Sequence, residues 1–171
     1  MKIAIIYTSR SGTAAECASL LGRELKNYDV TVSDIKNTQI SLDEFDMIVI
    51  GFPIRFGKAE KVAARYMKKN ETALLSKKVG YFMCCGFIDC FDEYVDKVIP
   101  RRLRENAVDI ACLGGQLDPL KVKGIDRVIV KAVRDEILGG GDNADQRDDM
   151  VLPTILDENI VQFATHLKDS I

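Results

Sequence analysis

The chain has 171 residues, of which 47% are hydrophobic and 29% charged, and its formal net charge is -2 at pH 7. This size and balance predict one domain spanning residues 1–171 with a sizeable core. A near-neutral chain lacks the basic footprint of nucleic-acid binding, and no segment approaches the roughly 20 apolar residues that span a bilayer. We expect neither a nucleic-acid partner nor a transmembrane segment.

The cysteine content indicates a reducing compartment. The chain has five cysteines, and an odd number argues against a disulfide framework. The apolar stretch 3–7 is too short for a signal-peptide core. We therefore expect a cytoplasmic protein. The single histidine, His166, is far in sequence from every cysteine, so no metal site is expected.

Strand-length apolar runs alternate with segments of helical periodicity along the chain. The runs lie at 3–7, 30–35, 47–50, 79–84 and 108–113, and the helical segments at 14–25, 59–66, 91–98, 125–133 and 160–167. Runs that are apolar throughout suit parallel strands covered on both faces. The pattern predicts an α/β fold with a doubly wound parallel sheet.

Some helix boundaries and connections can also be predicted. Residues 87–106 read as a compact helix, and residues 139–153 have the Gly-rich, polar composition of a surface loop. We expect Gly139 to cap the helix before it and Asp157 to be the N-cap of the last helix.

In doubly wound sheets, ligands bind outside the carboxyl ends of the strands. The first strand leads through a hydroxyl-rich loop directly into a helix, where backbone N–H groups and hydroxyls favour a phosphate. The alternative is an ordinary capped helix, which needs only one hydroxyl. The candidate phosphate-binding residues are Thr8, Ser9, Arg10, Ser11, Gly12 and Thr13.

This loop resembles the FMN phosphate loop of flavodoxins, which follows the pattern Thr/Ser-x-Thr/Ser-Gly-x-Thr. The resemblance implies a flavodoxin-like, three-layer α/β/α domain with a five-stranded sheet in the order 2-1-3-4-5. It also implies FMN as the cofactor.

The segment after the third strand resembles the isoalloxazine loop of flavodoxin-like quinone reductases and flavodoxin-type protoporphyrinogen IX dehydrogenases. The resemblance makes Phe56 the candidate ring neighbour, and Arg55 with nearby N–H groups is expected to stabilise negative charge on reduced flavin. A plain hydrophobic turn is the alternative. The candidate cofactor residues here are Pro53, Ile54, Arg55, Phe56 and Gly57.

The fourth strand ends at a second candidate wall of the flavin site, formed by Cys85, Gly86 and Phe87. Gly86 permits close approach of the backbone to a ring. We expect the thiols of Cys84 and Cys85 to be buried as small apolar groups, with redox chemistry as the alternative that Cys90 leaves open.

The resemblance extends through 114–117, 126–127 and the Gly-rich segment before the last helix. One departure bears on the substrate. Porphyrinogen-oxidising members carry a long basic insertion after the fourth strand, whereas residues 87–106 here look compact. The resemblance thus implies an FMN-dependent oxidoreductase with a quinone-like acceptor or a redox partner protein, and a homodimer stays open.

Two other functions are compatible with the sequence. The chain can be a flavodoxin-type one-electron carrier, although typical carriers are markedly acidic and this chain has basic clusters at Arg101-Arg102-Arg104 and in 121–134. It can also be a scaffold without flavin. No catalytic side chain is expected, because the flavin carries the chemistry.

Rival nucleotide and nucleophile motifs fail on spacing. Gly12 is the only glycine in the loop directly after the first strand, which excludes the dinucleotide fingerprint. Gly51 to Lys58 has one residue too many for a P-loop. Cys17 and Arg23 have phosphatase-loop spacing but lie within a predicted helix, where backbone N–H groups bond internally.

Overall fold

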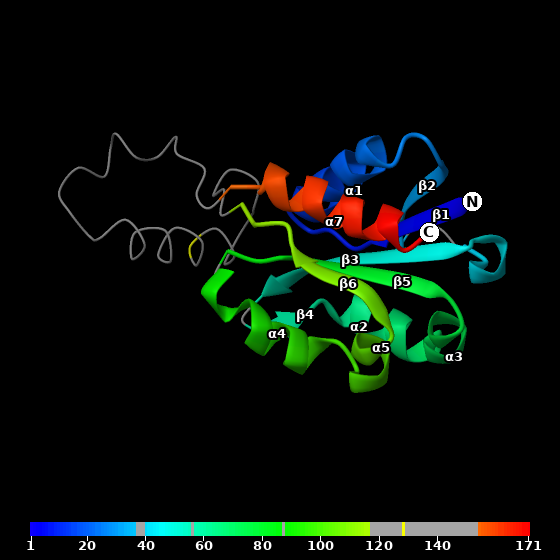
Figure 1. The fold of residues 1–171 in the computed structure, drawn as a ribbon. Coiled ribbons are helices and arrows are strands. Elements are labelled where there is room, and N and C mark those ends of the chain that lie inside the picture. Colours follow the sequence, from blue (N-terminus) through cyan, green and yellow to red (C-terminus); the bar gives the residue numbers. More distant parts are fainter. Residues whose placement is uncertain (37–39, 56, 87, 117–127, 129–153) are drawn as a thin grey trace.

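A parallel sheet organises the protein (Figure 1). The computed structural model describes residues 1–36, 40–55, 57–86, 88–116, 128 and 154–171. In this part of the chain, the parallel strands are β1 (Lys2–Tyr7), β2 (Asp29–Asp34), β3 (Met47–Arg55), β5 (Lys78–Cys84) and β6 (Ala107–Cys112). They lie in the order β2-β1-β3-β5-β6, and the short β4 (Lys58–Ala59) pairs antiparallel with β3. The predicted fold class and the order 2-1-3-4-5 are confirmed, because β5 and β6 are the fourth and fifth parallel strands.

Helices cover both faces of the sheet, as Figure 1 shows. One face carries α1 (Thr13–Glu24) and α7 (Asp157–Asp169). The other carries α2 (Lys61–Lys69), α3 (Glu71–Leu75), α4 (Phe91–Val98) and α5 (Arg101–Glu105). Two short 3-10 turns, η1 (Leu42–Glu44) and η2 (Ile88–Cys90), lie in the connections.

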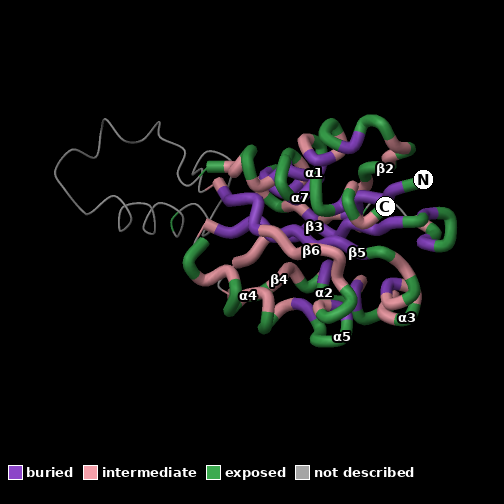
Figure 2. The backbone as a smooth tube through the Cα atoms, viewed as in Figure 1, coloured by how far each residue is buried: buried purple, intermediate pink, exposed green. Residues whose placement is uncertain are grey.

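The central strands are buried along nearly their whole length (Figure 2). Successive side chains of a strand point to opposite faces, so Ile3 and Ile5 pack under α1 and α7 while Ala4 and Ile6 pack on the opposite side. Burying an isoleucine side chain stabilises the fold by about 1.5–3 kcal/mol. The continuous apolar runs are therefore explained by two cores that share one sheet.

Strand β3 is longer than the sequence predicts. The prediction ended the strand at Ile50 and began a turn at Gly51, but β3 continues to Arg55 and forms a hairpin with β4. Gly51 lies against the ring of Phe82, where a Cβ atom would overlap the ring. Pairing with β1 ends at Gly51, so β3 has a neighbour on one side only at Pro53, a position where proline is tolerated.

Three helix predictions also need correction. Helix α2 begins at Lys61, after the β4 hairpin, and not at Ala59. The expected compact helix in 87–106 is two helices that separate at Pro100, because proline cannot continue α4. Asp157 is the first residue of α7 and Leu156 is its N-cap, so the Asp157 carboxylate acts in the first turn and not as the cap.

Several predictions fall outside the described residues. They are the helix at 125–133 apart from Val128, the cap at Gly139 and the loop at 139–153. The single domain over 1–171 also stays a prediction. No helix in the described ranges has the length and apolar character required to cross a membrane.

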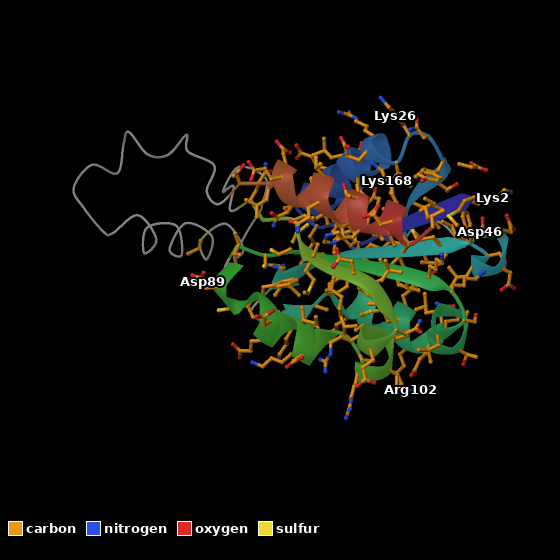
Figure 3. All side chains as sticks on the ribbon, viewed as in Figure 1. Lys2, Lys26, Asp46, Asp89, Arg102 and Lys168 are labelled. Atoms are coloured by element: carbon orange, nitrogen blue, oxygen red, sulfur yellow. The ribbon has the colours of Figure 1, made fainter. Side chains whose placement is uncertain are left out.

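The start of β1 is joined to the segment before β3. The backbone N–H of Lys2 donates to Asp46 Oδ2 at 2.8 Å, and Figure 3 shows both residues at the same end of the sheet. The opposite ends of the strands carry the candidate site.

Candidate functional site

The strand register brings the predicted loops to one edge of the sheet. Tyr7 on β1 is paired with Gly51 on β3, which is paired in turn with Phe82 on β5. Met83 is paired with Cys112 on β6. Because these strands are parallel, their carboxyl ends lie at the same edge of the sheet. The segments after β1, β5 and β6 begin at this edge, and the end of β3 projects from it.

The phosphate-loop candidates lead into the start of α1. The N-cap of α1 is Gly12, whose φ of 95° and ψ of -21° are left-handed and favour glycine. The helix has no side-chain cap hydrogen bond, and a Cβ atom added at Gly12 would have no neighbour within 4 Å. The first turn of α1 therefore presents backbone N–H groups beside open space, an arrangement that suits an anion.

The loop hydroxyls occupy different environments. Ser11 Oγ and Thr13 Oγ1 lie 3.3 Å apart at the helix start. Ser9 Oγ accepts a hydrogen bond from the Gly12 N–H at 3.1 Å, and exposed Arg10 follows Ser9. Thr8 is fully buried, and its hydroxyl lies beside the Glu60 carboxylate without reaching the geometry of a regular hydrogen bond. Ser11 and Thr13 are thus the hydroxyls best placed beside the N–H groups of α1.

An ion pair that the sequence analysis missed lies against this loop. Lys36 Nζ is 2.7 Å from Glu60 Oε1 and donates to the carbonyl oxygen of Ser9 at 3.2 Å. Burial raises the pKa of Glu60, but the Lys36 ammonium, the Thr8 hydroxyl and the Arg10 charge together outweigh burial and lower it. No motif signals this pair, because Lys36 and Glu60 come from separate connections.

The candidate ring loop after β3 is a hairpin. Ile54 pairs with Ala59 and Arg55 with Lys58, and the chain turns at Gly57 with a φ of 68°. Pro53, Ile54 and Arg55 are half-buried, and the space at the Cα atom of Gly57 is bounded by the Tyr94 ring of α4. Phe56, the predicted ring neighbour, lies outside the described residues.

The segments after β5 and β6 pack closely together. Cys85 is buried and Gly86 half-buried, and a Cβ atom on Gly115 would lie 2.7 Å from the Cys85 carbonyl carbon. Gly114 also pairs with Ile155 in an isolated antiparallel bridge. This contact fixes the backbone of Cys85 and Gly86 at the edge. Phe87 lies outside the described residues.

The Arg101–Arg104 cluster and His166 have charged partners, whereas the basic stretch 121–134 lies outside the described residues apart from Val128. Arg101, Arg102 and Arg104 pair with Glu105, Glu71 and Asp96 at 2.7, 3.5 and 2.6 Å. Carboxylates therefore balance this basic cluster, and Figure 3 shows Arg102 projecting outward. His166 Nδ1 lies 2.7 Å from Asp109 Oδ2. Within the described ranges, no group of His, Cys, Asp or Glu side chains is arranged to hold a metal ion.

An open parallel sheet with helices on both faces and an uncapped helix after its first strand defines a doubly wound α/β protein of the nucleotide-binding type. Comparison with known families gives the particular class. The family model for the flavodoxin domain matches residues 4–144, so the chain belongs to the flavodoxin domain family. The resemblance read from the sequence is confirmed.

Solved structures agree on the fold. Oxidised flavodoxin 1 from Bacillus cereus is 15% identical, with a TM-score of 0.55 over 100% of this chain and 99% of its own. Fusobacterium nucleatum flavodoxin bound to flavin mononucleotide is 12% identical, with a TM-score of 0.53 over 99% of this chain and 98% of its own. At these identities the likeness shows the fold alone.

A curated relative shares part of the sequence. Protoporphyrinogen IX dehydrogenase [quinone] from Escherichia coli K12 is 30% identical over 86 residues, which are 48% of this chain and 47% of the relative. The chain thus spans about half the length of the curated relatives it matches.

Proposed function

We propose that this protein binds FMN non-covalently and acts as a flavin-dependent oxidoreductase. The family, the FMN-bound F. nucleatum neighbour and the partial similarity to a quinone-linked dehydrogenase support this proposal. The single observation that carries it is the start of α1, where no side chain caps the helix and space is open at Gly12. This feature fits a phosphate monoester.

The chain's own groups hold the phosphate end. The N–H groups of the first turn of α1 and the hydroxyls of Ser11 and Thr13 donate to phosphate oxygens. Hydrogen bonds to charged groups contribute about 1.5–3 kcal/mol each. Gly12 places the backbone there because its left-handed conformation costs glycine little.

The β3–β4 hairpin and the segment after β5 hold the ring end. Pro53, Ile54, Arg55 and Gly57 supply one wall, and Cys85 and Gly86 supply the other. Contacts of Phe56 and Phe87 with the ring stay predictions from the sequence, because both residues lie outside the described ranges. Backbone N–H groups and the Arg55 guanidinium stabilise negative charge, which is how a protein adjusts a flavin potential. When bound, FMN supplies the electron and hydride transfer, and no side chain is required as a catalytic acid.

The electron acceptor is a quinone-like small molecule or a redox partner protein. The partial similarity to the E. coli dehydrogenase favours the first, and membership of the flavodoxin domain family makes a one-electron carrier the second candidate. The balanced Arg101–Arg104 cluster gives no support to either, because its charge is matched by carboxylates. A cytoplasmic location belongs to the same proposal.

A paired titration tests the phosphate site. Quenching of flavin fluorescence gives dissociation constants for FMN and for riboflavin, which lacks the phosphate. We expect Ser11→Ala and Thr13→Ala to weaken FMN binding about 10-fold or more and to leave riboflavin binding unchanged. Thr165→Ala is the matched control, because that hydroxyl bonds the Val161 carbonyl on the exposed side of α7. Absence of FMN binding at millimolar concentration would overturn the proposal.

A second experiment separates enzyme from carrier. Stopped-flow oxidation of the reduced holoprotein is followed with a soluble quinone and, separately, with a one-electron protein acceptor such as cytochrome c. Fast two-electron oxidation by quinone supports the oxidoreductase. If only the protein acceptor oxidises the holoprotein, and the spectrum shows a one-electron intermediate, the protein is a one-electron carrier instead.

A further inference from the structure

Four of the five cysteines gather in two pairs near the carboxyl ends of β5 and β6. Cys84 Sγ lies 3.7 Å from Cys17 Sγ on α1, and Cys85 Sγ lies 3.2 Å from Cys112 Sγ. All four are thiols, each at most 5% exposed. Although Cys84 and Cys85 are adjacent in sequence, the two pairs lie in different chemical surroundings.

The Cys17–Cys84 pair belongs to the core beneath α1 and α7. The contact with the Cys17 thiol raises the pKa of Cys84, and burial raises it further, well above the ordinary value. Cys17 is fully buried, and its thiol points toward the carbonyl oxygen of Leu113 at 3.9 Å. Cys84 therefore stays protonated and unreactive, because the thiolate is the nucleophile, and Cys17 is shielded by its complete burial.

The Cys85–Cys112 pair lies at the sheet edge and is held there by the backbone. Met83 is paired with Cys112, which places Cys85, two residues further along the chain, beside the end of β6. Gly115 packs against the backbone of Cys85 so tightly that any side chain would collide with it. The two sulfurs are 3.2 Å apart and must close to roughly 2.05 Å to form a disulfide.

The surroundings of Cys112 favour its thiolate. The Cys85 thiol hydrogen-bonds to the Cys112 sulfur and lowers its pKa, burial opposes this, and backbone hydrogen bonds from Gly114 and Cys85 add to the lowering. The resulting pKa of Cys112 is about 6. Cys112 is thus the nucleophile of the pair and Cys85 the resolving thiol.

We propose that Cys85 and Cys112 form a redox-active dithiol that hydrogen peroxide converts to a disulfide. The Cys112 thiolate attacks one peroxide oxygen, the O–O bond breaks, and hydroxide leaves and is protonated to water. The sulfenic acid on Cys112 is then attacked by Cys85 sulfur, the S–S bond forms, and a second water leaves. Two thiols are oxidised while one peroxide is reduced to two waters. A thiol reductant restores the dithiol by exchange.

Peptide mapping of the full-length protein tests the proposal. Dilute protein, with and without added FMN, is treated with hydrogen peroxide, alkylated and analysed by mass spectrometry. We expect a Cys85–Cys112 disulfide that a reductant reverses, in both samples. Cys85→Ala should trap sulfenic acid on Cys112 as a dimedone adduct, whereas Cys84→Ala, the matched neighbour, should form the disulfide within about threefold of the wild-type rate.

Two outcomes would overturn the proposal. One is a wild-type protein that keeps both thiols alkylatable under peroxide while half-buried Cys90 is oxidised. The other is a Cys85→Ala variant, folded by circular dichroism, that shows no sulfenic acid on Cys112. The wild-type mapping needs no variant, so poor folding of a mutant leaves the test intact. Because the same disulfide is expected without FMN, failure to bind flavin and failure to form the disulfide are distinguishable.

Discussion

Lys36 joins two connections of the fold through an ion pair, in which its Nζ lies 2.7 Å from Glu60 Oε1. Lys36 follows β2, whereas Glu60 is the N-cap of α2, and the same ammonium also donates to the carbonyl oxygen of Ser9. Glu60 Oε2 is buried without a hydrogen-bond partner among the described residues. Lys36 therefore holds both the carboxylate and the candidate phosphate loop.

Lys36→Met should destabilise the protein by about 1–2 kcal/mol, because it leaves a half-buried carboxylate without its charged donor. Urea unfolding at pH 7 measures the effect. Lys97→Met is the matched control, since it breaks an ion pair with Glu93 in which the two side chains are 57% and 59% exposed. Lys97→Met should lower the free energy of unfolding by no more than about 0.5 kcal/mol. Equal losses in the two variants would contradict this account.

The stability that Glu60 contributes should depend on pH with a definite sign. Its pKa is lowered in the folded state from an ordinary value of 4.5. A carboxyl with a lowered pKa stabilises the fold above its unfolded pKa, and this contribution is lost as the pH falls through the folded value. The difference in unfolding free energy between wild type and Glu60→Gln should therefore be constant near neutrality and shrink below pH 4.5. A difference that grows on acidification would show that burial dominates.

The backbone conformation at Gly12 should make alanine costly there. The φ of 95° is strained for an L-residue, while the side chain itself would meet open space. Gly12→Ala should cost about 1–2 kcal/mol in thermal or urea unfolding. Gly12→Asn should cost clearly less, because asparagine tolerates left-handed backbone. If both variants lose the same stability, strain is not the cause.

Gly51 should resist substitution for a different reason. A Cβ atom at Gly51 overlaps the Phe82 ring, so Gly51→Ala should cost about 1–3 kcal/mol through overpacking. Phe82→Leu makes room, and the double variant should lose less than the sum of the single changes. A double-mutant cycle by urea unfolding measures this coupling. Additive losses would mean that the two residues do not collide.

Alkylation should distinguish Cys112 from Cys84. The Cys85 thiol and the N–H groups of Gly114 and Cys85 face the Cys112 sulfur and hold its pKa at about 6, whereas the pKa of Cys84 is raised. The rate of Cys112 modification by iodoacetamide should therefore rise around pH 6 and level off near neutrality. Cys84 should remain slow throughout. A Cys112 rate that rises only around the ordinary value of 9.0 would contradict this assignment.

The sheet was predictable because its strands are buried on both faces. The runs at 3–7 and 79–84 are apolar at almost every position and are shorter than most helices, which is typical of parallel strands covered on both faces. Gly51 and Pro53 are residues typical of turns and therefore predict a turn, but both lie within β3. Glycine there makes room for the Phe82 ring, and proline sits where β3 has lost one neighbour.

Candidate site residues were predictable only where they follow one another in the chain. The hydroxyl-rich loop from Thr8 to Thr13 is visible in the sequence because it lies between a strand and a helix. The Lys36–Glu60 pair and the approach of Cys85 to Cys112 depend on strand order and register, which single segments do not contain. The predicted burial of Cys84 and Cys85 is confirmed, but the sulfur atoms that approach them belong to other segments of the chain.

Helix α7 has a consequence for how the protein reaches its native state. Phe163 and Leu167 crowd the space above Gly80 and join the core that contains Ile3 and Phe82. These contacts link the first strand to residues near the end of the chain, and such long-range contacts slow folding. A nascent chain still lacking α7 carries one sheet face with an unfilled apolar surface. Until α7 is made and packs there, that face is exposed to aggregation.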